Sequence, residues 1–179
     1  MSENRDLRGF TGAGYTIGRG RFAQVLWLVT QSLVFRPWWC PARLRTTLLR
    51  SFGAHVGSNV LVRHRVRVHW PWKLTIGDNA WIGEGAWLLN LEPIVIGRNA
   101  VVSQEAFLCT GSHDPRSPTF EFDNAPITVA DGAWVAARAI VLRGVTVGKN
   151  AVVGAGTVVD RDVPEGQTVV AGRSTPGKP

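Results

Sequence analysis

The sequence predicts an all-β solenoid, a stack of about five triangular coils. An aliphatic residue returns at every sixth position, a small residue stands four places after it in many repeats, and the repeats add up to coils of regular length. A helix needs a period of 3.6 residues and a flat strand a period of two, so neither explains this spacing. Each hexad is expected to form one side of a triangle. The inward positions are Ile76, Ile82, Leu88, Ile94, Ile96, Val102, Leu108, Val129, Val135, Val141, Val147, Val153 and Val159.

The spacing of the inward residues also defines the coils. Val56, Ile76 and Ile96 follow one another at intervals of twenty residues, and the interval that begins at Val129 is eighteen. The interval between Ile96 and Val129 is thirty-three residues. This coil is therefore expected to carry a protruding loop over about residues 113–126.

The first part of the chain departs from the six-residue period. Residues 21–35 read as a strongly apolar helix, two tryptophans follow it, and Pro41 is placed to start a second helix that ends at Gly53. The apolar run is shorter than the ~20 residues that cross a bilayer. No small-residue cleavage site follows it, which disfavours a secretory signal.

Two interpretations of this apolar helix remain open. A solenoid must cover its first coil, which favours a cap or an oligomer contact. Arginines at both ends and the adjacent tryptophans also suit peripheral contact of residues 19–45 with an anionic membrane. Residues 1–73 carry a net charge of about +10 and the remainder about −3, which favours anionic partners. One helix can fill both roles.

Length and composition predict one substantial core. The chain has 179 residues, 45% of them hydrophobic, and two cysteines far apart in the sequence. A disulfide framework is not expected, and a reducing, cytoplasmic location fits, with the inner face of the membrane as an open alternative. No nucleic-acid partner is expected, because the tryptophans are not interleaved with a basic groove. We divide the chain into an N-terminal helical segment (1–54), a solenoid (55–165) and a C-terminal tail (166–179).

His113 is the first candidate catalytic residue. It stands where the chain leaves a strand of the solenoid to form the loop, so a rigid stack supports it on one side, as a general base requires. Asn90 occupies the same face of the preceding coil, where its amide either orients a substrate oxygen or satisfies a turn. Glu92 and Asp114 are weaker candidates for holding the histidine tautomer. A plain loop or turn role for His113 remains the alternative.

The hexads, the loop that begins at a histidine and three later runs resemble the hexapeptide-repeat acyltransferases. The runs are residues 126–136, 144–148 and 153–159. Residues 48–54, 71–78 and 102–114 resemble more closely the colanic-acid-type exopolysaccharide O-acetyltransferases within that superfamily. The resemblance implies a left-handed parallel β-helix.

The resemblance also implies a homotrimer, with acetyl-CoA in a groove between neighbouring prisms and a saccharide or lipid-linked oligosaccharide as the acceptor. His113 matches the family's general base, and Asn90 matches an acceptor-side position. No metal is implied. The expected cofactor-binding residues are Trp134, Ala137, Gly154, Ala155, Arg161 and Lys178, where small residues let pantetheine approach the backbone and cations pair with phosphates.

Three alternatives compete with direct acetyl transfer by a histidine base. Cys109 as the nucleophile of an acetyl-enzyme lacks an evident base of its own. His64 and His69 have the spacing of two ligands in a γ-carbonic-anhydrase-like zinc enzyme, but three arginines surround them and disfavour a dication. A trimeric scaffold or membrane-binding module without enzymatic activity is the third.

Overall fold

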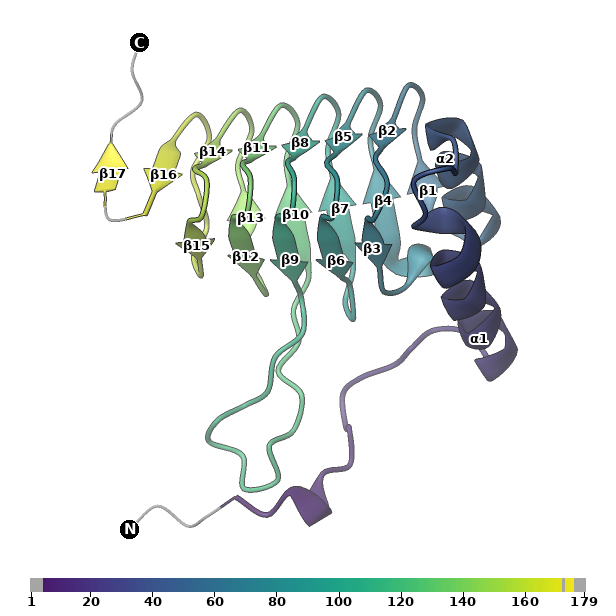
Figure 1. Ribbon diagram of the computed structural model, residues 1–179. Coiled ribbons are helices and arrows are strands. Elements are labelled where there is room, and N and C mark those ends of the chain that lie inside the picture. The colour runs from purple at the N-terminus through teal and green to yellow at the C-terminus, as the bar shows by residue number, and fades with distance from the viewer. Residues whose placement is uncertain (1–4, 172, 176–179) are drawn as a thin grey trace.

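Most hexads of the repeat form a strand of two or three residues followed by a tight turn. The computed structural model describes residues 5–171 and 173–175. Over this part of the chain the strands stack into three parallel sheets that enclose the core, with helices over one end (Figure 1). The predicted solenoid class is therefore confirmed.

The three sheets are the sides of the prism. The first sheet contains β1 (His55–Val56), β4 (Leu74–Ile76), β7 (Ile94–Ile96), β10 (Ile127–Val129) and β13 (Thr146–Val147). The second contains β2 (Leu61–Val62), β5 (Trp81–Ile82), β8 (Val101–Val102), β11 (Trp134–Val135), β14 (Val152–Val153), β16 (Thr168–Val170) and β17 (Arg173–Thr175). The third contains β3 (Arg67–Val68), β6 (Trp87–Leu89), β9 (Phe107–Cys109), β12 (Ile140–Leu142) and β15 (Val158–Val159).

The strand register reproduces the coil lengths read from the sequence. Ile76 pairs with Val56 on one side and with Ile96 on the other, twenty residues away in each direction. Val129 pairs with Ile96 across the interval that contains the loop. All the inward residues of the hexads are at most 5% exposed, so they form one continuous core.

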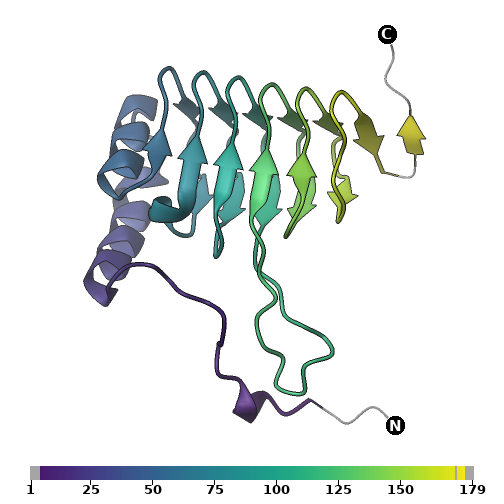
Figure 2. The same cartoon turned by 180° about the vertical axis from the view of Figure 1, so that it is seen from behind.

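The helical segment closes the first coil. It consists of α1 (Arg21–Thr30), a π-helical turn (Gln31–Phe35) and α2 (Ala42–Ser51), which together cover one end of the prism (Figure 2). Pro41 is the N-cap of α2, close to its expected place at the start of that helix. The expectation of a cap is therefore confirmed.

The cap also satisfies main-chain groups of the first coil. The Trp27 Nε1–H donates to the Val68 carbonyl at 2.9 Å, and the Val68 N–H donates to Gln31 Oε1 at 2.7 Å. Arg50 Nε donates to the Val56 carbonyl at 2.9 Å. Side chains thus complete hydrogen bonds that a preceding coil would otherwise supply.

At the other end the stack continues beyond the expected boundary at residue 165. β16 pairs in parallel with β14, and β17 then pairs antiparallel with β16. Five full turns are therefore followed by a partial sixth, one more than the sequence indicated. The period hides this turn because Val163, which bridges to Val147, comes four residues after Val159 instead of six.

Candidate active site

The loop that interrupts the repeat is an ordered hairpin. We call residues 110–126 the loop hairpin; it leaves the prism after β9 and returns at β10 (Figure 1). The Asp114 N–H donates to the Glu121 carbonyl at 2.8 Å, and the Asp123 N–H donates to the Ser112 carbonyl at 2.9 Å. His113 lies opposite Phe122 in an antiparallel bridge. The candidate base is therefore fixed by both arms of the hairpin.

The His113 imidazole is oriented by Phe120. Its Nδ1 lies 2.7 Å from the Phe120 carbonyl oxygen. A carbonyl only accepts, so Nδ1 carries the proton and the neutral ring keeps its lone pair on Nε2. The two rings also stack, with centroids 4.4 Å apart and planes at 4°. Phe120 has a left-handed φ of +58°, an unfavourable conformation for a bulky residue, and it turns this carbonyl toward the imidazole.

Neither Glu92 nor Asp114 holds the histidine tautomer. Glu92 lies 3.9 Å from Lys73 Nζ, and Asp114 Oδ1 accepts the Arg116 N–H at 2.8 Å. Nothing in the sequence predicts a main-chain carbonyl in this role. The alternating aromatics at Phe120 and Phe122 were the available signal, because they flank the histidine from the returning arm of the hairpin.

Asn90 is fully buried, with no exposed surface. Its Oδ1 accepts the Trp70 N–H at 2.9 Å, and its Nδ2 donates to the Trp70 carbonyl at 2.5 Å. Both ends of the amide are therefore bound to the preceding coil. Of the two roles that the sequence left open, the geometry favours the structural one.

Three of the six expected cofactor residues gather at another edge of the prism. Ala137 and Ala155 line a hollow of about 590 Å³ between the second and third sheets, together with Gln104, Glu105, Arg138 and Gly156. We call this edge the alanine corner. Gly154 lies beneath this hollow and is buried. A Cβ at this position would stand 2.7 Å from Val170 Cγ1. Its small size is thus required by the stacking of the coils.

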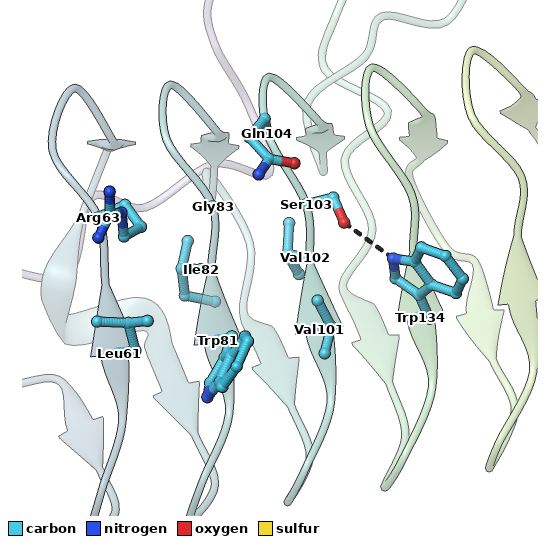
Figure 3. A pocket seen from close by; sticks show the side chains of 10 residues that line it. All are labelled: Leu61, Arg63, Trp81, Ile82, Gly83, Val101, Val102, Ser103, Gln104 and Trp134. Atoms are coloured by element: carbon cyan, nitrogen blue, oxygen red, sulfur yellow. Dashed lines mark hydrogen bonds between the residues drawn. The ribbon is translucent and has the colours of Figure 1, made fainter.

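Trp134 lies in a groove on the second sheet. The groove has a volume of about 490 Å³ and is lined on one side by Trp81 and Leu61 (Figure 3). Trp134 is 47% exposed, and its Nε1–H donates to Ser103 Oγ at 2.8 Å. An exposed indole held by a hydrogen bond offers a flat apolar surface beside the alanine corner.

Of the two cations expected to bind phosphate, only Arg161 lies within the described residues. The Arg161 side chain is 90% exposed, directly after β15 and beside Asp160. Lys178 lies outside the described residues. Arg161 is therefore free to approach a phosphate, and it lies on the same edge as the loop hairpin rather than at the alanine corner.

Within one chain the candidate base lies apart from Trp134 and the alanine corner. His113 follows the third sheet and precedes the first, whereas Trp134 belongs to the second. In Figure 1 the loop hairpin leaves the lower edge of the prism, while β11 lies along its upper side. These candidate residues are therefore distributed over different edges of the prism.

The competing nucleophile and metal sites are placed unfavourably. Burial raises the pKa of the Cys109 thiol, whose Sγ donates to the Gly111 carbonyl at 3.2 Å, so the reactive thiolate is scarce at neutral pH. His64 Nε2 lies 3.2 Å from Glu84, and His69 packs on Trp70. Within residues 5–171 and 173–175, no three His, Cys, Asp or Glu side chains come together as metal ligands do.

Comparison with known proteins identifies relatives that share the repeat. The family models "Bacterial transferase hexapeptide (six repeats)" and "Hexapeptide repeat of succinyl-transferase" match residues 126–161 and 73–103. The putative colanic acid biosynthesis acetyltransferase WcaF of Escherichia coli (strain K12) is 41% identical over 145 residues, 79% of each protein.

Two solved structures share the fold. A hexapeptide-repeat acetyltransferase of Vibrio cholerae in complex with acetyl-CoA has a TM-score of 0.79 at 24% identity, covering 96% of this chain and 94% of that one. A maltose O-acetyltransferase of Clostridium difficile 630 has a TM-score of 0.79 at 21% identity, covering 88% and 89%.

The family models place the chain among the hexapeptide-repeat transferases. Within that class, the chain belongs to the family of colanic-acid-type acetyltransferases. It is an acyltransferase. The relationship favours acetyl transfer over the scaffold and zinc-enzyme alternatives.

Proposed function

We propose that the protein transfers an acetyl group from acetyl-CoA to a saccharide hydroxyl in exopolysaccharide biosynthesis, with His113 as the general base. The observation that carries this proposal is the hydrogen bond between His113 Nδ1 and the Phe120 carbonyl, because it leaves the Nε2 lone pair available for a hydroxyl proton. The relationship to WcaF supports a polysaccharide acceptor.

The reaction follows from this arrangement in two proton transfers. His113 Nε2 takes the hydroxyl proton as the sugar oxygen bonds to the thioester carbonyl carbon. The carbon–sulfur bond then breaks, and the imidazolium returns the proton to the departing thiolate. A hydrogen bond to a carbonyl oxygen also fixes the ring orientation during both transfers.

Replacement of His113 by Ala tests the base. The loss of general-base action is expected to lower kcat by ~10²–10⁴-fold, while the Kd for acetyl-CoA, measured by calorimetry, stays the same. The assay follows release of the CoA thiol with colanic-acid oligosaccharides and maltose as acceptors. His64→Ala is the matched control, because His64 lies at another corner against Glu84. Residual kcat above about a tenth of the parent value would remove His113 from this role.

We further propose that the active unit is a homotrimer. The candidate base lies on a different edge of the prism from Trp134 and the alanine corner, so two neighbouring chains are needed to complete a site. The hollow at the alanine corner and the exposed Trp134 indole are suited to the pantetheine arm, and Arg161 to a phosphate. Asn90 keeps only its structural role in this proposal.

Mixing two inactive variants tests shared sites. His113→Ala and Trp134→Ala chains are each expected to be nearly inactive, whereas trimers reassembled from equal amounts recover about a quarter of the parent activity. That fraction follows because a site is intact only when each neighbour supplies the half that the other lacks. Failure of the mixture to recover activity, despite exchange of subunits, would exclude shared sites.

Part of the helical cap, within residues 19–45, is exposed and does not pack on the first coil. One stripe of α1 and the following turn is apolar and exposed, and we call it the outer face: Phe22 (81% exposed), Val25 (59%), Leu26 (45%), Val29 (49%) and Leu33 (65%). Trp38 and Trp39 extend it, at 80% and 53% exposure. Such a contiguous exposed patch indicates an interaction surface.

The charge around the outer face selects an anionic membrane as its partner. No Asp or Glu occurs between Asp6 and Asp78, while Arg21, Arg36 and Arg43 are exposed beside the patch. Apolar residues rimmed by arginine and tryptophan are typical of helices that lie in the membrane interface. In the described parts of the chain, no helix has the length and apolar character needed to cross a bilayer. The proposed contact is thus peripheral, at the cytoplasmic face, where lipid-linked acceptors are held.

Sedimentation with vesicles tests this contact. The parent protein is expected to sediment with vesicles containing anionic phosphatidylglycerol at low salt and to be released by high salt. The variant V25E/L33E is expected to stay in the supernatant. V95E/V158E adds the same two charges to the prism, where Val95 and Val158 are 39% and 56% exposed, and serves as the control. If the parent protein does not sediment with anionic vesicles, the membrane contact is refuted and the outer face is left as a contact between protein chains.

A further inference from the structure

Residues 5–17 form an extended arm that lies along the loop hairpin. The arm begins beside the tip of the hairpin and runs toward α1 (Figures 1 and 2). The Asp6 N–H donates to the Pro118 carbonyl at 2.9 Å. Gly9 fits so closely that a Cβ there would lie 2.6 Å from Thr119 Cγ2. The six-residue period does not extend to this segment, and its contacts are with the hairpin instead.

A single carboxylate, that of Glu121, holds the centre of the arm. Its Oε1 accepts the Thr11 N–H at 2.9 Å, and its Oε2 accepts the Gly12 and Ala13 N–H groups at 3.0 and 3.2 Å. The Thr11 hydroxyl adds a hydrogen bond at 3.1 Å. Three successive N–H groups aimed at one anion form charge-assisted bonds that a neutral side chain cannot reproduce. The Thr11 N–H bond is the main reason that the pKa of Glu121 is lowered.

The residue next to this anchor reaches the candidate base. The Phe10 ring lies 5.8 Å from the His113 ring and 5.2 Å from the Phe122 ring, centroid to centroid. Phe122 in turn stacks on His113 at 4.9 Å. Together with Phe120, these rings surround the imidazole with aromatic surface, and Phe10 is the only one of the three that the arm supplies.

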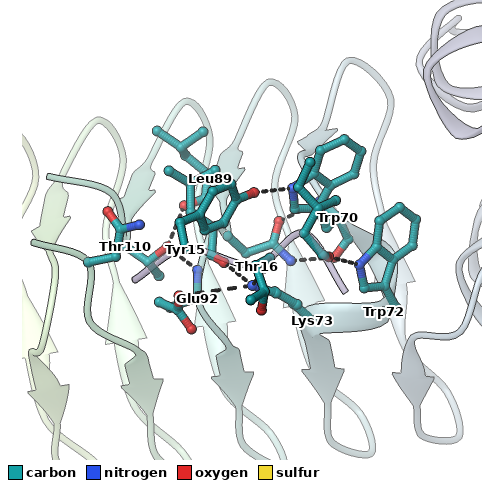
Figure 4. Close-up of polar contacts among 12 residues, drawn as sticks. Tyr15, Thr16, Trp70, Trp72, Lys73, Leu89, Glu92 and Thr110 are labelled. Atoms are coloured by element: carbon teal, nitrogen blue, oxygen red, sulfur yellow. Dashed lines mark hydrogen bonds and ion pairs between the residues drawn. The ribbon is translucent and has the colours of Figure 1, made fainter. Parts of the chain in front are cut away.

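The far end of the arm is bonded to the prism. The Trp70 Nε1–H donates to the Tyr15 hydroxyl at 2.7 Å, and the Trp72 Nε1–H donates to the Ile17 carbonyl at 2.6 Å. Lys73 Nζ donates to the Thr16 carbonyl at 2.5 Å (Figure 4). Tyr15 also packs edge-on against Phe122 at 5.2 Å. The arm thus bridges the first two coils and the hairpin that leaves the third.

We propose that this arm is part of the catalytic apparatus, with Glu121 as the residue that positions Phe10 against the His113 ring. The inference rests on His113 being the base. Glu121 directly follows Phe120, whose carbonyl fixes the imidazole, so one short segment controls the ring from two sides. Releasing the arm removes the Phe10 wall and loosens the hairpin, and catalysis is sensitive to small displacements of a base.

The test compares Glu121→Gln with the full-length parent in two independent measurements. Hydrogen exchange of the peptide that contains residues 9–15 is expected to become roughly tenfold faster, because an amide nitrogen then faces backbone donors. The kcat for acetylation of a colanic-acid oligosaccharide is expected to fall about tenfold, less than the ~10²-fold cost of a 1 Å misplacement. The KM for acetyl-CoA stays constant, because the expected cofactor residues at the alanine corner and Trp134 lie on other edges.

Asp131→Asn is the matched control. Asp131 is another exposed carboxylate that accepts a backbone N–H, that of Arg98 at 2.8 Å, but it lies at the corner between the first and second sheets. This variant is expected to keep the parent kcat and the parent exchange of the arm. A thermodynamic cycle with Phe10→Ala completes the test: the double variant should be no slower than the slower single variant, because Glu121 acts through Phe10.

The outcomes separate this inference from the proposed function. Faster exchange with an unchanged kcat would show a held arm without a catalytic role and overturn the inference. Unchanged exchange would overturn the part assigned to Glu121, and independent effects in the cycle would overturn its action through Phe10. Activity retained by His113→Ala would instead refute the base, whatever the exchange of the arm.

Discussion

Replacing Trp27 by Phe tests how the helical cap closes the solenoid. Trp27 has no exposed surface, and its indole N–H donates to the Val68 carbonyl. Phe keeps a ring against Phe35 and Phe52, whose centroids lie 5.4 and 5.1 Å from that of Trp27, but it supplies no donor. The substitution therefore leaves a buried carbonyl without its partner and removes part of a packed side chain.

The expected cost is about 2–4 kcal/mol, combining an unsatisfied buried acceptor with a small cavity. For a chain of this size the Tm should fall by roughly 5–10 °C. Thermal unfolding followed by circular dichroism measures it. Trp81→Phe is the control, because Trp81 is 56% exposed and surface substitutions usually change stability by less than about 0.5 kcal/mol. Equal Tm values for the two variants would refute the role assigned to the indole donor.

Three further predictions concern Glu121, Asn90 and Cys109. The lowered pKa of Glu121 means that its ionised form stabilises the attached arm. Exchange protection of residues 9–15, corrected for intrinsic rates, should be complete above the ordinary pKa of a glutamate and be lost as the pH falls through the lowered pKa of the folded state; a flat profile would contradict this. Asn90→Ala should destabilise the fold by about 1–3 kcal/mol because the Trp70 N–H loses its acceptor; a fall in kcat without a fall in Tm would restore an acceptor-side role. Cys109→Ala should retain the parent kcat, and the thiol should react slowly with iodoacetamide at neutral pH; a loss of activity together with a trapped acetyl-cysteine would revive the covalent route.

The repeating part of the molecule was predictable because one physical constraint acts at every position. Each hexad needs an inward aliphatic residue and a small residue at the turn. The burial of Ile76 and Ala80, both almost fully buried, is therefore predictable from the sequence. His113 became a candidate for a related reason: the loop interrupts the period at that residue. The partial sixth turn was not predicted, because the interval from Val159 to Val163 is shorter than six residues and shifts the phase of the repeat.

The rest depended on contacts between distant segments, which periodicity does not encode. The arm contains glycines at 9, 12 and 14 and lies outside the six-residue period, and Glu121 holds it from more than a hundred residues away. Asn90 lies on the face that the sequence indicated, but the hydrogen bonds between its amide and the Trp70 main chain are evident only from the structure. The separation of His113 from Trp134 on the prism follows from the order of the sheets, which the sequence does not state directly.

The two ends of the prism explain why such a stack remains a discrete molecule. Parallel strands in register form a lattice that can grow without limit, as in amyloid fibrils. Here the first rung offers an indole and an amide side chain in place of free main-chain groups, and the last presents β17, which runs against the direction of the stack. In the second sheet, an incoming parallel strand would therefore meet an antiparallel edge at β17. Side chains at one end and a reversed strand at the other thus limit the growth of the stack.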